Sequence, residues 1–477
     1  MIYSNNYQYK TPLLNGIGTL GVSNSKKKLQ FFTQDGNNAR AVILGGNTDK
    51  YPSKNYNPYL DNNSNFYKKN YDSPSYSNSS IDQNNYKYNN NSYNYGLSSQ
   101  TQTSKKNLPN SIINSNDYIY DKNYEKRKPS YNDELNDNYK SSSNSNIYYK
   151  SIISSRVGLK NLGNTCFMNT CLQNLIHSED FIKRLISKSN MINSNTPITL
   201  KFYNLCQSMA AEGKGSIFPD EFKLKFGSKH SLFSGYGQND TQEFCRILLE
   251  DMNKELNEGK PKAPYKELNT SGKSKIECDE EFDKLFRKRE SSIVMDSFYA
   301  QIINIFTCKC KYNTFSFQKI LDFPLLLRNT NSTVTLFELL DDYFDVEYIQ
   351  FDTKCENCKK RREHKKEIKI SRPPNILILS IQRINGRTKR KNNCVVEFSE
   401  KLNIKKYIDT ECGYGKECEY ELYGVGNHSG NIDFGHYFAY VKLNGNWYEF
   451  NDSIVSKIGR INTISREVYT LFYKKIM

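Results

Sequence analysis

Two segments of this 477-residue chain carry side chains that together suit nucleophilic catalysis. Cys166 follows a Gly-Asn-Thr turn and precedes apolar residues at helical spacing, in the run FMNTCLQNLIHSEDFIKRLI at 167–186. The positive end of a helix dipole favours the thiolate form of a thiol placed there. Backbone N–H groups at the same helix start could hold an oxyanion. The alternative for any cysteine is a small buried hydrophobe, which Cys171, Cys206 and Cys245 fit.

A nucleophilic thiol needs a general base, and the best candidate is His436. It lies in FGHYFAYVKLNGNWYEFND, which predicts two strands joined by an Asn-Gly turn. On such a hairpin, His436 and the pair Asn451–Asp452 come side by side. Asn or Asp can then accept a hydrogen bond from the imidazole and fix its tautomer, which aims the ring at the thiol.

The other four histidines fit the role of base less well. His428, in NHSG, is expected in a loop. His177 lies about three turns along the predicted helix and points away from Cys166. His230 and His364 stand in polar stretches without an orienting partner nearby. A lone histidine usually has a structural or solvated role, so only His436 is assigned as base.

These segments resemble the cysteine and histidine boxes of the ubiquitin-specific protease family, which are papain-like deubiquitinases. GLKNLGNTCFMNTCLQNL at 158–175 is similar to the nucleophile box, and residues 420–458 resemble the histidine box. GYGQNDTQEFCRILLEDMN at 235–253 resembles the family's Gln-Gln-Asp-Ala-Gln-Glu-Phe helix. NILILSIQRI at 375–384 is similar to its central strand. The resemblance begins near Val157 and runs to the end of the sequence.

The resemblance implies a role for each matching catalytic position. Cys166 would be the nucleophile and His436 the base. Asn451 would orient His436, and the adjacent Asp452 would support or share that role. Asn161 matches the family's side-chain donor to the oxyanion.

The same comparison implies the residues that meet the ubiquitin tail. Asp240 and Glu243 match acidic positions that could pair with the arginines before the terminal Gly-Gly. Helix capping is the alternative for these two carboxylates. Gln238, Gly435 and Tyr437 are expected to line the substrate groove. The family often has Gly-Gly before the catalytic histidine, whereas this chain has Phe434-Gly435, so the mouth of the channel is altered.

Four cysteines form a candidate metal site. Cys308-x-Cys310 and Cys355-x-x-Cys358 resemble the zinc site at the tip of the family's fingers, although the first pair is one residue tighter. Four thiolates suit tetrahedral zinc in a structural role, and they leave no position open for water. The alternative is a hairpin with free thiols. The basic run KKRREHKK at 359–366 predicts a solvated loop, with a nucleic-acid patch or a nuclear import signal as alternatives.

Composition divides the chain into two parts. Residues 1–155, the arm, are rich in Asn, Ser and Tyr, carry a net charge of +7 (18 basic and 11 acidic residues) and have few aliphatic side chains to bury. The arm is expected to be disordered, and its segment AVILGG at 41–46 could form a short strand without an obvious partner. Residues 156–477 are expected to form the catalytic domain.

Helical patterns precede strand patterns in that domain, which predicts an α+β fold with segregated layers. Helices are expected at 167–186 and 239–256, an exposed excursion at 258–292, and strands at 298–308, 375–384 and 436–443. The resemblance implies a papain-like arrangement with a helical thumb, a β palm and β fingers.

The net charge of +16 suggests acidic partners. No run of eighteen apolar residues and no secretory start are present, and no cysteine precedes Cys166. A cytoplasmic or nuclear location without a membrane partner is therefore expected. The function that follows is thiol-dependent hydrolysis after the C-terminal glycine of ubiquitin. The alternatives are an inactive ubiquitin-binding module and a basic zinc-ribbon protein that binds nucleic acid. Nucleic acid is not expected, because no recognition motif is present.

Overall fold

A computed structural model describes most of the chain from residue 142 onward. It covers 142–477 except for 265, 267, 271–272, 329–332, 351–353, 386–389, 417, 433 and 477, and it adds the short strands β1 (Lys28–Leu29) and β2 (Ile43–Leu44). The chain divides into two units, and one of them, Thr48–Asn132, lies outside these residues. The predicted disorder of the arm therefore lies almost entirely outside the described residues. Within the arm, the short strand expected at 41–46 is present as β2. It pairs antiparallel with β1, a partner that the sequence did not reveal.

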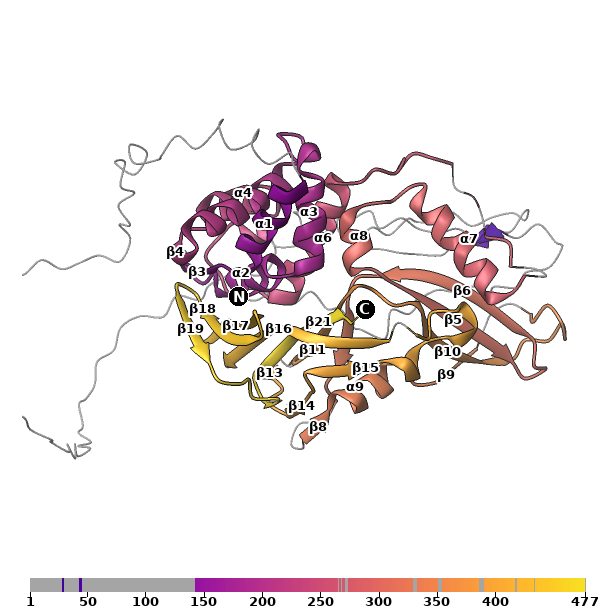
Figure 1. Cartoon of the computed structure of the whole chain (residues 1–477). Coiled ribbons are helices and arrows are strands. Elements are labelled where there is room, and N and C mark those ends of the chain that lie inside the picture. Colours follow the sequence, from indigo (N-terminus) through magenta and orange to yellow (C-terminus); the bar gives the residue numbers. More distant parts are fainter. Residues whose placement is uncertain are drawn as a thin grey trace, which may run out of the picture. The chain divides into compact units, whose positions relative to one another are not determined.

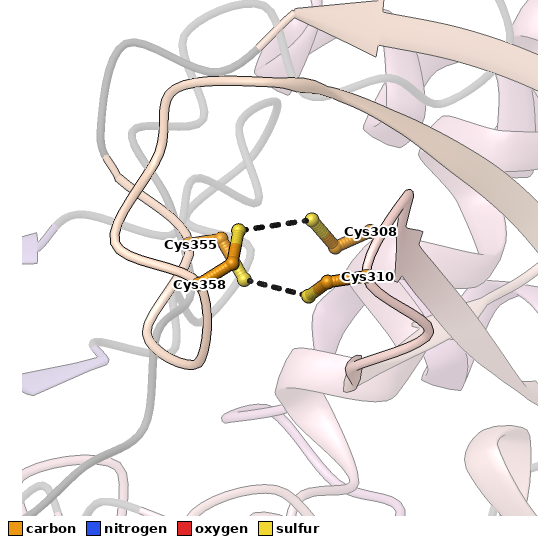
Figure 2. Close-up of side chains that lie close together, drawn as sticks. All are labelled: Cys308, Cys310, Cys355 and Cys358. Carbon is orange, nitrogen blue, oxygen red and sulfur yellow. Dashed lines mark hydrogen bonds between the residues drawn. The ribbon is translucent and has the colours of Figure 1, made fainter.

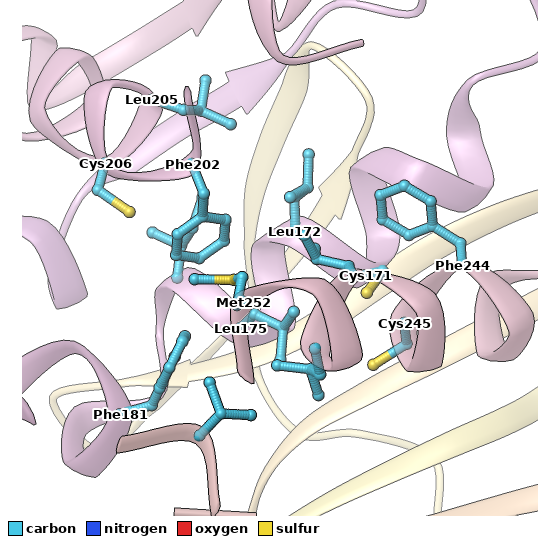
Figure 3. Close-up of a cluster of buried hydrophobic side chains, with 14 of the residues drawn as sticks. Cys171, Leu172, Leu175, Phe181, Phe202, Leu205, Cys206, Phe244, Cys245 and Met252 are labelled. Atoms are coloured by element: carbon cyan, nitrogen blue, oxygen red, sulfur yellow. The ribbon is translucent and has the colours of Figure 1, made fainter. Parts of the chain in front are cut away.

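The first half of the described region is mainly helical, and α2 lies between the other helices and the large sheet (Figure 1). Every residue of α2 is buried. Figure 3 shows Cys171, Leu172 and Leu175 of this helix packed with aromatic and sulfur side chains of its neighbours, among them Cys206 and Cys245. These helices are α1 (Ser142–Ile153), α2 (Cys166–Ile176), α3 (Glu179–Ser187), α4 (Pro197–Glu212), α5 (Asp220–Lys229), α6 (Thr241–Glu255) and α8 (Ile293–Phe298).

Two predicted boundaries in this region were wrong. The helix expected at 167–186 is two helices, because Ser178 is the N-cap of α3 and Glu179 and Asp180 occupy its first turn. The end of the arm was placed after residue 155, yet α1 packs on α3 and α4. Tyr149 and Ile152 of α1 belong to the buried core. The apolar stripe of α1 is too short to stand out within a segment rich in Ser and Asn.

The large sheet carries the second half of the site. Its strand order is β19-β18-β17-β16-β21-β11-β7, antiparallel except for β7 beside β11, and β15 also pairs with β16. Helix α2 lies directly on β16, where a Cβ on Gly424 would come within 2.2 Å of the Asn174 side chain. The strands are β7 (Phe323–Leu326), β11 (Ile376–Gln382), β15 (Lys401–Asn403), β16 (Glu419–Gly430), β17 (Gly435–Leu443), β18 (Asn446–Asn451), β19 (Ile454–Ile458) and β21 (Val468–Lys475).

A separate four-stranded sheet forms the fingers, with the order β6-β5-β10-β9. Its strands are β5 (Ala300–Cys308), β6 (Asn313–Ile320), β9 (Glu347–Gln350) and β10 (Glu363–Arg372). Helix α7 (Lys275–Arg287) covers part of it, with the Phe282 ring stacked on Phe317 at 5.7 Å. The expectation of an exposed excursion at 258–292 was therefore wrong for α7, where Cys278 and Phe282 form a buried stripe within a charged sequence. Several described residues at 258–266 are exposed, as expected.

Smaller elements complete the fold. They are the parallel pair β3 (Arg156–Leu159) and β4 (Lys214–Ile217), the pair β12 (Ile384–Asn385) and β13 (Arg390–Lys391), the three-stranded sheet β8 (Thr333–Thr335), β14 (Val395–Glu397) and β20 (Ile464–Ser465), helix α9 (Leu336–Tyr343), and single 3-10 turns at Ser189–Met191, Ser231–Phe233, Lys405–Tyr407 and Thr410–Cys412. Helices first and sheets later confirm the predicted α+β class. No helix within the described residues has the length and apolar character needed to cross a membrane.

Candidate active site

Cys166 is the first residue of α2 and is buried. The turn before it uses left-handed backbone at Gly163 (φ 105°) and Asn164 (φ 52°). The side-chain oxygen of Asn161 accepts hydrogen bonds from the backbone N–H groups of Gly163 and Thr165, both at 3.0 Å. The thiol therefore stands at a helix N-terminus, as predicted, on a loop that Asn161 holds in shape.

His436 approaches this thiol from the sheet. Strands β17 and β18 form the predicted hairpin, and the Asn444-Gly445 turn has positive φ at both residues. The His436 Nε2 lies 2.7 Å from the Asn451 Oδ1. A hydrogen bond with the Cys166 thiol raises the pKa of His436 to about 9, and the bond with Asn451 acts in the same direction. The structure thus brings together the three residues expected at the reacting centre.

Asp452 was expected to support or share the orienting of His436, and the structure shows its carboxylate bonded elsewhere. Its Oδ2 accepts from the Asn161 side-chain amide at 2.9 Å, and its Oδ1 accepts from that of Asn169 at 2.8 Å. Its backbone is left-handed (φ 49°), and its carbonyl accepts from the Leu159 N–H at 2.8 Å. The carboxylate therefore holds the loop before Cys166, and only its charge acts on His436.

Sequence reasoning missed Asn169, although a signal was available. Asn169 stands three residues after Cys166, so it lies on the same face of α2. It is buried, and its amide also donates to the Leu159 carbonyl at 3.0 Å. This one side chain links the nucleophile helix, β3 and Asp452.

The two acidic positions on α6 differ in what they contact. Asp240 is the N-cap and accepts from the backbone N–H groups of Gln242 and Glu243, at 2.8 and 3.0 Å. It also accepts from the Tyr469 hydroxyl, a contact for which the sequence carries no signal. The alternative of helix capping therefore describes Asp240. Glu243 is half-buried, and burial together with the Asp240 charge raises its pKa to about 7.

Gln238, Gly435 and Tyr437, the other residues expected to line the substrate groove, also differ in their surroundings. The Gln238 amide donates to the Asn164 side chain at 3.1 Å and to the Gly435 carbonyl at 3.3 Å, so it joins the loops before Cys166 and before His436. Gly435 has no room for a side chain, because a Cβ would lie 2.1 Å from the His428 ring. Tyr437 is buried beneath this layer, so it supports the groove and does not line it. Phe434, directly before Gly435, is 86% exposed.

Two expectations for the other histidines were wrong. His428 lies in strand β16 and not in a loop, packed against Tyr437, and burial lowers its pKa to about 3. His230 does have an orienting partner, since its Nε2 lies 2.6 Å from the Asp251 carboxylate. His177 bonds the carbonyls of Gln173 and Ser155, and His364 that of Arg362. None of these four contacts the Asn451 side chain within the described residues.

The four predicted metal-ligand cysteines come together at the end of the fingers (Figure 2). Their sulfur atoms all lie within 4.8 Å of one another. Cys308 is 3.9 Å from Cys358, and Cys310 is 3.7 Å from Cys355. A backbone N–H from Tyr312 lowers the pKa of Cys310 to about 6, which favours its thiolate. All four are free thiols, so the cluster could bind zinc.

Comparisons with known proteins agree with this geometry. Residues 157–473 match the family described as ubiquitin carboxyl-terminal hydrolase. The chain is 31% identical over 352 residues to ubiquitin carboxyl-terminal hydrolase Usp2 of Drosophila melanogaster. This alignment covers 70% of this chain and 37% of the relative. It is also 31% identical over 338 residues to ubiquitin carboxyl-terminal hydrolase 2 of Bos taurus, in an alignment that covers 66% of this chain and 54% of the relative. The match thus spans less than two thirds of either relative.

Solved structures show the same fold. The SAGA DUB module of Ubp8, Sgf11, Sus1 and Sgf73 bound to monoubiquitin aligns with a TM-score of 0.53 and 24% identity, covering 69% of this chain and 70% of that chain. The same module bound to ubiquitin aldehyde gives a TM-score of 0.53 over 69% of this chain and 71% of that chain. The expected fold class is confirmed.

Proposed function

Because the chain belongs to the ubiquitin carboxyl-terminal hydrolase family, we propose that it is a thiol-dependent deubiquitinase. The reaction is hydrolysis of the peptide or isopeptide bond after the C-terminal glycine of ubiquitin. The observation that carries the proposal is the alignment of Cys166, His436 and Asn451. A helix start and a strand hairpin, about 270 residues apart in the sequence, meet so that one imidazole contacts both the thiol and an orienting amide.

The chemistry follows from these contacts. The Asn451 side-chain oxygen occupies the Nε2 side of the His436 ring, so the Nδ1 side is left to take the proton of Cys166. The thiolate attacks the carbonyl carbon of the terminal glycine, and the oxyanion is stabilised by the Asn161 amide with backbone N–H groups of the helix start. His436 then protonates the leaving lysine amine. Water, deprotonated by His436, releases ubiquitin from the thioester.

Glu243 is proposed as the carboxylate that meets an arginine of the ubiquitin tail. It is partly open to solvent, whereas Asp240 is committed to the start of α6 and to Tyr469. A carboxylate whose pKa is raised by burial gains most from an arriving guanidinium. Gln238 and Gly435 would then form the narrow passage for the Gly-Gly end.

We also propose that the cysteine cluster binds one structural zinc. Four thiolates at about 2.3 Å from a tetrahedral metal lie about 3.8 Å from one another. The paired sulfur distances of 3.7 and 3.9 Å fit that geometry despite the tighter Cys308-x-Cys310 spacing. The metal would join the β5–β6 turn to the segment that enters β10, and it would take no part in hydrolysis.

Neither alternative function is favoured. An inactive ubiquitin-binding module has no need of the nucleophile, base and orienting amide in contact. A basic zinc-ribbon protein would not account for the helical layer and its buried thiol. The cytoplasmic or nuclear location stays a prediction.

A ubiquitin probe with a thiol-reactive group at its C-terminus tests the proposal. We expect the full chain to form a covalent adduct, and Cys166→Ala to abolish it while keeping ubiquitin binding. His436→Ala should lose almost as much turnover, because the two residues act as one unit. Cys171→Ala, on the same helix and buried, is the matched control. Adduct formation in Cys166→Ala at the rate of the unmodified chain would refute the assignment.

A further inference from the structure

The tip of the fingers carries a dense positive charge that the hydrolytic site does not use. We define the fingertip as residues 308–312 and 354–362, the two turns that hold the four cysteines. These turns contain seven basic residues and one acidic residue, Glu356. The basic residues are Lys309, Lys311, Lys354, Lys359, Lys360, Arg361 and Arg362, of which all but Arg362 are exposed.

The seven cations and Glu356 sum to +6, and a zinc ion held by four thiolates would add −2, so the fingertip keeps a net charge of +4. Lys309 pairs with Glu363 at 3.2 Å, and among the described residues no other basic residue of the fingertip makes an ion pair within 4 Å. Glu356 faces the Tyr312 hydroxyl at 3.5 Å. Several unneutralised cations held on two short, hydrogen-bonded turns create a strong local field that attracts anions.

Two of these lysines occupy backbone positions that favour glycine. Lys311 (φ 66°) and Lys359 (φ 57°) are left-handed, and each directly follows the second cysteine of its pair. The turns are closed by Lys311 N–H to the Cys308 carbonyl at 2.7 Å and by Lys359 N–H to the Cys355 carbonyl at 2.8 Å. Glycine adopts this conformation without strain, and lysine does not. The chain therefore keeps lysine at two equivalent positions where the fold alone favours glycine.

The composition of the surface indicates the class of partner. Protein interfaces are usually centred on apolar or aromatic anchors, and no large exposed hydrophobic side chain lies in the fingertip as the structure describes it. Besides its cations, the surface carries the exposed Asn357, one of whose amide hydrogens is directed at the Cys310 sulfur, at 3.7 Å. Single-strand binding would need exposed aromatic rings, but Tyr312, the aromatic residue here, is half-buried beside Glu356. A regular array of phosphates therefore fits best.

We propose that the fingertip binds the phosphate backbone of a nucleic-acid duplex. Binding would be independent of base sequence, because it would consist of contacts between lysine or arginine and phosphate oxygens. It would hold the enzyme near nucleic acid while leaving the cleft at Cys166 free. The expectation that nucleic acid is not a partner rested on the absence of a recognition motif, and contacts with the phosphate backbone need no such motif.

The double variant Lys311→Gly/Lys359→Gly tests the proposal without endangering the fold, because glycine relieves both left-handed turns. We expect its thermal unfolding temperature to equal or exceed that of the unmodified full chain. With a fluorescein-labelled 20-base-pair DNA duplex, fluorescence anisotropy should show about tenfold weaker binding at 0.1 M salt. The slope of log affinity against log salt should become shallower by about 2, as for two lost phosphate contacts.

Lys401→Gln/Lys405→Gln is the matched control, since it removes two exposed lysines elsewhere and changes the net charge equally. It should bind DNA as the unmodified chain does. An RNA duplex of the same length identifies which nucleic acid is preferred, and loss of binding in the fingertip variant supports the proposal in either case. Equal binding by the fingertip variant and the control would overturn it, and would place the affinity in the rest of this basic chain. Binding of polyglutamate of matched charge as tightly as either duplex would also overturn it, in favour of an acidic protein.

Discussion

At the residue scale, the contacts of Asp452 separate it from Asn451. Asn451 touches the imidazole, whereas Asp452 gives one carboxylate oxygen to Asn161 and the other to Asn169. Asp452 thus positions Asn161, the proposed oxyanion donor. Because both of its carboxylate oxygens are engaged, Asp452 is not free to replace Asn451.

We expect Asp452→Ala to lower kcat by about a hundredfold with little change in KM, because Asn161 loses the bond that aims its amide. Asn161→Ala should cost a similar factor. The double variant should be no worse than either single one, since both remove the same stabilisation. Steady-state hydrolysis of a fluorogenic ubiquitin C-terminal amide measures all three. Losses that multiply to about ten-thousandfold would show that the two residues act separately.

Glu243 should make substrate binding depend on pH. Its pKa is raised to about 7 in the free enzyme, so the carboxylate is charged above that pH and becomes neutral as pH falls through it. KM for the ubiquitin substrate should therefore rise below about pH 7, where the pair with a tail arginine is lost. Glu243→Gln should have a raised KM without this pH dependence. A KM profile in Glu243→Gln that still bends near pH 7 would assign the titration to another group.

At the scale of elements, α1 belongs to the folded domain although it precedes the region that matches the family. Tyr149 and Ile152 are buried in the helical core, and burying side chains of this kind contributes roughly 2 kcal/mol each. A stable catalytic unit is therefore expected to include α1 and to begin at or before residue 142.

Removing residues 1–141 should leave turnover within a few-fold of that of the full chain and the free energy of unfolding nearly unchanged. Removing residues 1–155 should lower the free energy of unfolding by about 3 kcal/mol or more, because the surfaces of α3 and α4 beneath α1 become exposed. Urea unfolding of the two shortened chains measures the difference. Identical midpoints would mean that α1 adds nothing to the core.

At the scale of the whole molecule, the cysteine cluster joins strands that are otherwise held only by the fingers sheet. Cys308 and Cys358 are 50 residues apart in the sequence, and their sulfurs are 3.9 Å apart in the structure. A metal at this point closes a long loop, so its binding energy becomes folding energy.

We expect purified protein to contain one zinc per chain. Cys355→Ser should lower the thermal unfolding temperature by about 5 °C or more while changing kcat per folded molecule little. Cys418→Ser is the matched control, because Cys418 is equally buried and lies outside the cluster. Elemental analysis and thermal unfolding test this. A structural zinc would be contradicted if the unmodified protein contained no metal and if Cys355→Ser unfolded at the same temperature as the Cys418→Ser control.

The sequence by itself determined the features that depend on short-range patterns. A Gly-Asn-Thr turn before a helix identified Cys166, and an Asn-Gly hairpin placed His436 near Asn451. The helix expected at 239–256 is α6, and the three predicted strands are β5, β11 and β17. The spacing of the cysteines anticipated the cluster. In each case the determining interactions lie within one turn, one hairpin or one knuckle.

Only the tertiary structure decided which polar groups each site residue contacts. Asn161 and Asp452 are 291 residues apart, and Asp240 and Tyr469 are 229 residues apart, so no local pattern predicts either hydrogen bond. The same holds for the burial of Tyr437, whose ring also packs edge-on against Tyr469 of β21 at 5.5 Å. A hydrogen bond between distant segments forms only after the helical layer and the sheet have packed, because the whole core then sets the distance between the two groups.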